Sequence, residues 1–187
     1  MKTKNRTNQP QIKGLKANQI CDAEIATLVK TRMREMNYEY QFDGCTLEVK
    51  LLYDRKLVVC LPDNPTAVER ILGRLPQYAA AVNSVPGEYC VKNHIRTTAT
   101  DKTTENVDNK MEKRETDGIP FEMTFEEIIV RLPKNRELSR KLESLTMDEI
   151  AQVCDEMPAY ADAIDSVPYY FRIRPVLSCD KWENNVS

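Results

Sequence analysis

The stretch Pro76–Pro86 reads P-Q-Y-A-A-A-V-N-S-V-P, and it returns almost unchanged at Pro158–Pro168 as P-A-Y-A-D-A-I-D-S-V-P. Seven of the eleven positions are identical, and two others exchange valine for isoleucine and asparagine for aspartate. A match of this density predicts two copies of one supersecondary unit. Proline suits the first turn of a helix, and the alanines that follow favour helix. We therefore expect a short helix in each copy, ended by the Ser-Val-Pro turn.

Similar sequence also lies on either side of the two stretches. Leu57–Pro62, L-V-V-C-L-P, precedes the first as Ile128–Pro133, I-I-V-R-L-P, precedes the second, and both are apolar runs typical of strands. Y-C-V at 89–91 follows the first stretch as F-R-I at 171–173 follows the second. The sequence therefore predicts an α+β fold built from two related small units, an internal duplication.

The first unit is expected to run strand, strand, helix, helix, strand. Strands at 46–53 and 56–61 are expected to form a short hairpin. Residues 46–53 alternate polar with apolar side chains, residues 56–61 are mostly apolar, and a short polar turn joins them. A helix begins at Asn64-Pro65, with a capping side chain and a proline in the first turn, and stops at Gly73. The short repeated helix then leads into a strand over 88–98.

The second unit is expected to follow the same plan with one addition. The strand at 128–132 precedes a helix over about 136–145, which accounts for eleven more residues between the Leu-Pro pair and the repeated proline. Thr146 with Glu149 three residues later forms a capping box that opens another helix. The repeated helix and a strand over 169–177 close the unit.

An amphipathic helix is expected ahead of the first unit. Between residues 18 and 36 the apolar side chains recur at spacings of three and four, which places them on one face: Cys21, Ile25, Leu28, Val29, Met33 and Met36. The stretch 98–118 is polar and has no aromatic residue, as expected of a linker. The expected organisation is a basic arm (1–16), the helix with the first unit (17–97), the linker (98–118), the second unit (119–178) and a polar tail (179–187).

The composition is that of an ordinary globular protein. The chain has 187 residues, of which 41% are hydrophobic and 30% charged, and its formal net charge is −2. No apolar run approaches the roughly 18 residues that cross a bilayer, and the polar start lacks the apolar core of a signal peptide. We therefore expect a cytoplasmic protein with no membrane partner.

Residue types that carry chemistry are sparse. The six cysteines are scattered without C-x-x-C spacing, so we expect reduced thiols, with Cys60 and Cys90 buried in strands. His94 is the only histidine and lies about 13 Å along a strand from Cys90, too far for a catalytic dyad. Glycine-rich phosphate loops are absent from the sequence. We predict no catalytic residue, no metal site and no cofactor.

Two further features have an ordinary structural interpretation. Residues 146–170 contain six acids and no lysine or arginine, but Asp148 and Glu149 suit the first turn of a helix, and the other acids alternate with core residues. Tyr78 and Tyr160 lie beside alanines at helical spacing, which favours core positions over an aromatic recognition pair. We assign neither the acids nor the tyrosines to a binding site.

The two termini are the predicted docking segments. The first sixteen residues carry five cations and no acid, and the tail places its tryptophan in polar surroundings. The predicted partner-binding residues are Lys2, Lys4, Arg6, Lys13, Lys16 and Trp182.

These features favour a non-enzymatic structural or adaptor subunit of a larger assembly, such as a virion component. The repeated residues are core and turn residues rather than a site, and the partners expected are other protein chains in a homo- or hetero-oligomer. Two alternatives stay open. The basic arm with Lys30, Arg32 and Arg34 would suit a nucleic-acid-binding protein, and a cleft between the two units would suit an enzyme.

Overall fold

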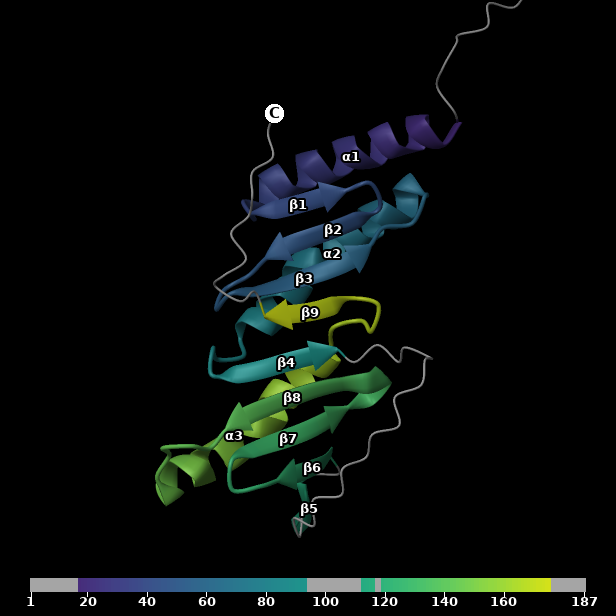
Figure 1. Cartoon of the computed structure of the whole chain (residues 1–187). Coiled ribbons are helices and arrows are strands. Elements are labelled where there is room, and N and C mark those ends of the chain that lie inside the picture. Colours follow the sequence, from purple (N-terminus) through teal and green to yellow (C-terminus); the bar gives the residue numbers. More distant parts are fainter. Residues whose placement is uncertain (1–16, 94–111, 117–118, 176–187) are drawn as a thin grey trace, which may run out of the picture.

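A computed structural model describes residues 17–93, 112–116 and 119–175 of the chain (Figure 1). Within these ranges the fold is α+β, as the sequence predicts. The helices are α1 (Ala17–Met36), α2 (Pro65–Asn83) and α3 (Met147–Asp165), with a 3-10 turn, η1, at Pro133–Asn135. The strands are β1 (Tyr40–Asp43), β2 (Thr46–Lys50), β3 (Arg55–Cys60), β4 (Tyr89–Asn93), β5 (Glu112–Thr116), β6 (Ile119–Met123), β7 (Glu127–Leu132), β8 (Arg136–Lys141) and β9 (Arg172–Pro175).

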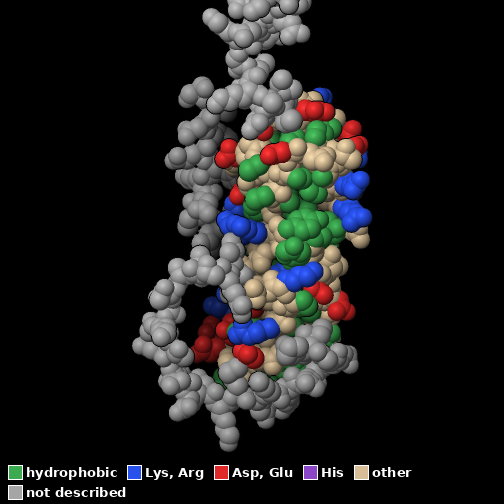
Figure 2. Space-filling view, turned by 90° about the vertical axis from the view of Figure 1, so that its right-hand side faces the viewer, with side chains coloured by type: hydrophobic (Ala, Val, Ile, Leu, Met, Phe, Trp, Pro, Cys, Tyr) green, Lys and Arg blue, Asp and Glu red, His purple; other side chains and the backbone are tan. Residues whose placement is uncertain are grey.

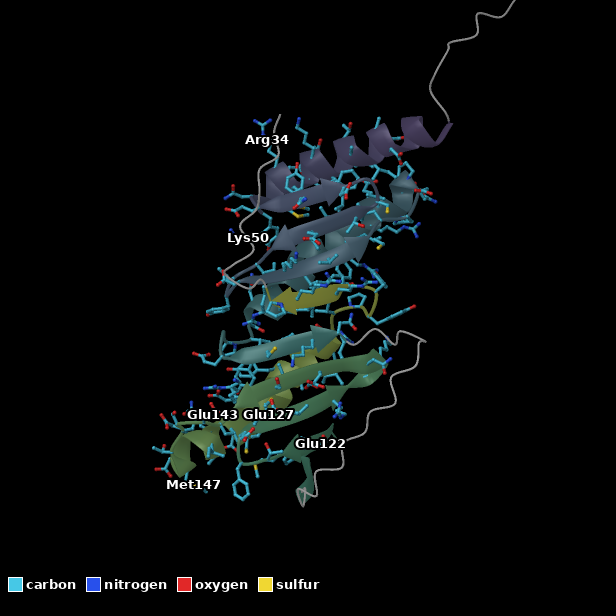
Figure 3. All side chains as sticks on the ribbon, viewed as in Figure 1. Arg34, Lys50, Glu122, Glu127, Glu143 and Met147 are labelled. Carbon is cyan, nitrogen blue, oxygen red and sulfur yellow. The ribbon has the colours of Figure 1, made fainter. Side chains whose placement is uncertain are left out.

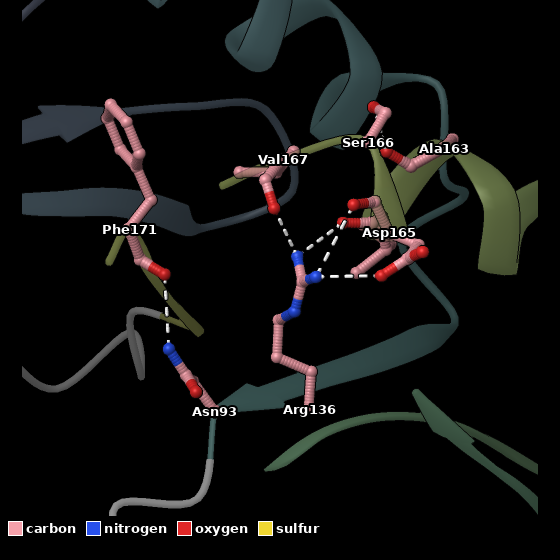
Figure 4. A network of polar contacts seen from close by, with 8 residues as sticks. Asn93, Arg136, Ala163, Asp165, Ser166, Val167 and Phe171 are labelled. Atoms are coloured by element: carbon pink, nitrogen blue, oxygen red, sulfur yellow. Dashed lines mark hydrogen bonds and ion pairs between the residues drawn. The ribbon is translucent and has the colours of Figure 1, made fainter. Parts of the chain in front are cut away.

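The described strands form two antiparallel sheets that exchange one strand each. The first sheet has the order β1-β2-β3-β9, so its last strand comes from the C-terminal half of the chain. The second has the order β4-β8-β7-β6-β5, so β4 crosses from the N-terminal half to pair with β8. β4 and β9 lie side by side where the sheets meet (Figure 1). There the Asn93 side-chain nitrogen donates to the Phe171 carbonyl oxygen at 3.1 Å (Figure 4).

The three helices lie on one face of the sheets. α2 covers the first sheet, α3 covers the second, and α1 packs beside α2 and against β1 (Figure 1). Alternate strand residues point at the helices, which buries Leu47 and Val49 of β2 and Leu57 of β3 completely. Within the described ranges, no helix covers the opposite face.

α2 and α3 are each one continuous helix, where the sequence predicts two. α2 passes through Gly73 and Pro76, and α3 passes through Pro158. The prediction was wrong because burial of the helix faces outweighs the local cost of the glycine and proline residues. The helix starts are as predicted: Asn64 accepts from two first-turn amides of α2, and Thr146 and Glu149 form the capping box of α3.

The segment predicted as a helix over 136–145 is instead a strand, β8 at Arg136–Lys141. β8 pairs with β7 on one side and with β4 on the other. These non-local hydrogen bonds decide the conformation of a segment whose polar composition is compatible with a helix. The predicted hairpin of the first unit, by contrast, is present as β2 and β3.

Two buried arginines hold the helix ends in the same way in both halves. The Arg55 guanidinium, at the start of β3, donates to carbonyl oxygens in the last turn of α2 and in the segment after it: Val82, Val85 and Pro86. The Arg136 guanidinium, at the start of β8, donates to the carbonyl oxygens of Ile164, Asp165 and Val167 and pairs with the Asp165 carboxylate at 2.8 Å (Figure 4). The counterpart of β3 is therefore β8, whereas the sequence comparison of the Leu-Pro runs matches β3 to β7.

The two tyrosines of the repeated stretches pack across the strand exchange. Tyr78 of α2 is buried and meets the Phe171 ring edge-on at 5.2 Å, and Tyr160 of α3 is half-buried and meets Tyr89 at 5.0 Å. Phe171 immediately precedes β9, and Tyr89 begins β4. Each helix therefore packs its tyrosine on an aromatic residue beside the other half's closing strand.

Some predicted features fall in part or wholly outside the described ranges. The described part of the predicted linker at 112–116 forms β5, an edge strand of the second sheet. The basic arm, the tail and His94 lie outside the described residues. Among the helices that the structure describes, none combines the length and apolar character needed to span a bilayer.

Candidate functional site

A groove of about 620 Å³ crosses the face of the first sheet that no described helix covers. β2, β3 and β9 form its floor, the end of β4 and η1 form one wall, and the turn before β9 adds two tyrosines. We call it the open-face groove. Its lining residues are Thr46, Glu48, Val58, Cys60, Asn93, Lys134, Asn135, Tyr169, Tyr170, Arg172 and Arg174.

Strand alternation places the arginines of β9 in the groove. Ile173 is buried against the helices, so Arg172 and Arg174 point to the opposite face. At a rise of about 3.3 Å per residue, their Cα atoms lie roughly 6.6 Å apart along the strand. Cys60 of β3 also lines the groove and is exposed, which corrects the prediction that it is a buried thiol. It is the last residue of the strand and points away from the helices.

η1 brings a lysine onto the aromatic wall. Lys134 and Asn135 have φ of 62° and 59°, so the chain turns sharply between β7 and β8 in a left-handed conformation. This turn places the Lys134 ammonium 4.9 Å from the centre of the Tyr169 ring, within cation-π range. Lysine and tyrosine are thus held together although 35 positions separate 134 from 169 in the sequence.

The tyrosine pair is solvent-exposed, and its rings contact each other and a buried phenylalanine. Tyr169 is 58% exposed and Tyr170 47%. Their ring centres lie 5.8 Å apart, and the Tyr170 ring lies 5.1 Å from that of Phe171, which is fully buried. Partial burial raises the pKa of the Tyr170 phenol above its usual value. Figure 2 shows hydrophobic side chains, tyrosine included, gathered on one face between lysine and arginine side chains.

The groove carries an excess of positive charge. Its lining holds three cations, Lys134, Arg172 and Arg174, and one carboxylate, Glu48. The Glu48 carboxylate is 2.7 Å from the Lys56 ammonium, so its charge is already compensated. Arg172 and Arg174 make no ion pair with another residue in the ranges described. Two guanidinium forks are therefore available to carboxylates or phosphates of a ligand.

The partner-binding residues predicted from the sequence are not among the described residues. The arm and tail residues Lys2, Lys4, Arg6, Lys13, Lys16 and Trp182 lie outside the described ranges. Lys30, Arg32 and Arg34 lie on α1, where Arg32 pairs with Glu35 at 3.0 Å. Within 17–93, 112–116 and 119–175, histidine, cysteine, aspartate and glutamate residues form no group of three that would hold a metal ion.

Two features of the sequence could have indicated the groove. Arg172-Ile-Arg174 is an alternation that places two arginines on one strand face, and Tyr169-Tyr170 directly follows the repeated Ser-Val-Pro turn. No protein family, no curated protein and no solved structure matches this chain. Its function is therefore inferred from its own geometry.

Proposed function

We propose that the chain is a non-enzymatic adaptor or structural subunit that binds another protein through the open-face groove. The observation that carries this proposal is the combination of two exposed tyrosines with two arginines that lack an ion-pair partner in the described ranges. Tyrosine and arginine are the residues most enriched in the energetic centres of protein interfaces. The ring contacts that Tyr169 and Tyr170 already make restrict their side chains, which reduces the entropy lost on binding.

The partner segment that fits is extended and acidic. Arg172 and Arg174 lie on one face of an extended strand, so a segment with carboxylates two residues apart matches their spacing. Tyr169, Tyr170 and Val58 supply apolar contact for a neighbouring side chain. The groove is thus suited to a segment in which acids alternate with apolar residues.

The proposed setting is a multi-chain assembly inside the cell, such as a virus particle. The support for it is the five-cation arm, with Trp182 in the tail, which would give the chain further contacts besides the groove. We also propose that the two halves arose by duplication. The repeated stretches and the matching bonds of Arg55 and Arg136 support this origin.

We further propose that the N-terminal helix is amphipathic and packs its apolar face on the first half. Ile25, Val29 and Met33 recur every four residues of α1 and are buried beside α2. The helix would then belong to the packed first half rather than to a docking arm. Residues 1–16 remain the proposed arm.

A binding assay with two probes tests the adaptor proposal. A fluorescent peptide of alternating glutamate and leucine is titrated against the full chain by anisotropy, and a twelve-nucleotide single-stranded RNA is titrated in parallel. Substitution of Arg172→Glu with Arg174→Glu should weaken peptide binding at least about tenfold. The matched control is Arg70→Glu with Lys141→Glu, two exposed cations outside the groove, and it should bind the peptide normally.

Single-stranded RNA is the alternative ligand that the same groove would suit, because stacked aromatic rings and arginines also bind bases and phosphates. RNA binding that is tighter than peptide binding and is lost with Arg172 and Arg174 would replace the adaptor proposal with nucleic-acid binding. Failure of the chain to bind either probe, or equal loss in the control variant, would overturn the assignment of the groove.

A further inference from the structure

A second, apolar pocket lies between α3 and the second sheet. Its lining residues are Phe121, Ile128, Val130, Cys154, Met157, Pro158 and Ala161. Two large apolar side chains lie at the nearby end of the sheet: Phe125, in the β6–β7 turn, is fully exposed, and Met147, at the start of α3, is 78% exposed. Figure 3 places Met147 at the end of the second sheet that is farthest from α1.

The corresponding place in the first half is filled by a helix. The strand order and registers match β1-β2-β3 to β6-β7-β8, and the repeated prolines match α2 to α3. α1 lies against α2 and β1 and buries Ile25, Val29 and Met33 there. In the part of the chain that the structure describes, the second half has no helix in that position.

Matched positions in α2 and α3 show the difference. Val68 and Leu72 of α2 are 0% and 1% exposed beneath α1. Their counterparts in α3, eight and four residues before the repeated proline, are Ile150 and Cys154, and both are only half-buried. The side chains are apolar in each case, so the greater exposure in α3 follows from the missing cover rather than from the sequence of the helix.

Among the described residues, acidic side chains of α3 lie beside the pocket. Asp148, Asp155 and Asp162 are exposed and recur every seven residues along α3, which places them in one row beside Cys154 and Pro158. They make no ion pair with other residues in the described ranges, and α3 contains no lysine or arginine. Figure 3 shows Glu127 and Glu143 near the start of α3 as well. A ligand with cations beside its apolar face would complement this border.

The pocket itself is small, about 20 Å³. We propose that the half-buried face of α3 around it, with Ile150, Cys154 and Pro158, is the docking site for an amphipathic helix of a partner protein, seated on α3 and the second sheet as α1 is seated on α2 and β1. The partner helix carries aliphatic residues at i, i+4 and i+8, the spacing of Ile25, Val29 and Met33, and lysine or arginine on the flank that faces Asp155 and Asp162. This site deepens the proposed adaptor function, because it gives the chain a second protein-binding surface distinct from the open-face groove.

The probe is a synthetic peptide of residues 17–36 with Cys21→Ser and a fluorescent label. It carries the aliphatic spacing and also Lys30 and Arg34, and it is titrated by anisotropy against the full chain. Saturable binding is expected. Ile150→Glu should weaken it about tenfold or more, because the substitution places a charge on the half-buried apolar face of α3 beside the pocket. Asp155→Lys with Asp162→Lys should weaken it several-fold, whereas Asp63→Lys with Glu69→Lys, the matched charge change beside α2, should leave it unchanged.

Thermal unfolding of every variant keeps the test independent of misfolding. If Ile150→Glu lowers the melting temperature substantially, the exposed double aspartate variant still tests the site. Peptide binding that is insensitive to both variants would mean exchange with the resident α1 and would overturn the proposal. Self-association of the unliganded chain through the pocket, seen by sedimentation and abolished by Ile150→Glu, would also overturn it in favour of a dimer. The Arg172→Glu, Arg174→Glu variant should bind the helical peptide normally. A failure of the proposal for the open-face groove is therefore distinguishable from a failure of the helix-docking proposal.

Discussion

Replacing Arg136 by methionine should destabilise the fold by about 3 kcal/mol. The substitution leaves the carbonyl oxygen of Val167, a completely buried residue, without its donor, and it removes one donor from the Ile164 carbonyl, which keeps its bond from the Val167 amide. An orphaned buried acceptor costs about 1–3 kcal/mol and a lost hydrogen bond about 0.5–1.5 kcal/mol, so the two changes cost roughly 2–4 kcal/mol together. Removing a guanidinium that is 2% exposed returns part of this cost, because burial disfavours its charge and lowers its pKa.

Urea unfolding followed by circular dichroism measures the loss, which corresponds to a fall in melting temperature of roughly 6–12 °C for a chain of this length. Arg55→Met should cost a similar amount, since Arg55 also donates to three carbonyl groups. The control is Arg32→Met, which breaks an exposed i,i+3 pair and should cost under about 0.5 kcal/mol. A loss below about 1 kcal/mol at both buried arginines would refute the reasoning, because the cost of burying the charge would then equal the value of its hydrogen bonds.

Three further substitutions test other parts of the structure. The Tyr89 hydroxyl is buried without a partner in the described ranges, and burial raises its pKa to about 12. The unfolded phenol loses its proton near pH 10 and the folded one near pH 12, so the free energy of unfolding should fall as pH rises between these values. Tyr89→Phe should abolish this fall, measured by urea unfolding at alkaline pH. At neutral pH the variant should be as stable as the parent chain or more stable, because it removes a buried unpaired hydroxyl. Thr146→Ala should cost about 1 kcal/mol through loss of the α3 cap, measured by thermal unfolding, and the cap should weaken on acidification, since its hydrogen bonds lower the Glu149 pKa. Pro158→Ala should raise the unfolding free energy by about 1 kcal/mol, because it restores an amide donor inside α3; an unchanged or lower value would mean that the proline ring is needed at the apolar pocket.

Local chemistry decided which parts of the fold the sequence predicted. The capping residues Asn64 and Thr146 mark their helix starts correctly, and the Ser-Val-Pro turns lead into strands, because these signals depend on adjacent residues. The segment at 136–141 was wrongly predicted as helix since its conformation depends on β4 and β7, which are distant in sequence. The same limit applies to the open-face groove, whose cation and ring at Lys134 and Tyr169 come from separate segments.

The strand exchange links folding of the two halves to formation of the groove. α2 leads into β4, which completes the second sheet, and α3 leads into β9, which completes the first. The groove needs β2 and β3 from one half, and η1 and β9 from the other. Tyr78 on Phe171 and Tyr160 on Tyr89 stabilise the exchanged arrangement from both sides. The apolar pocket, in contrast, is built from β6, β7 and α3 alone, and it shares no lining residue with the groove, so a variant of either surface tests that surface separately.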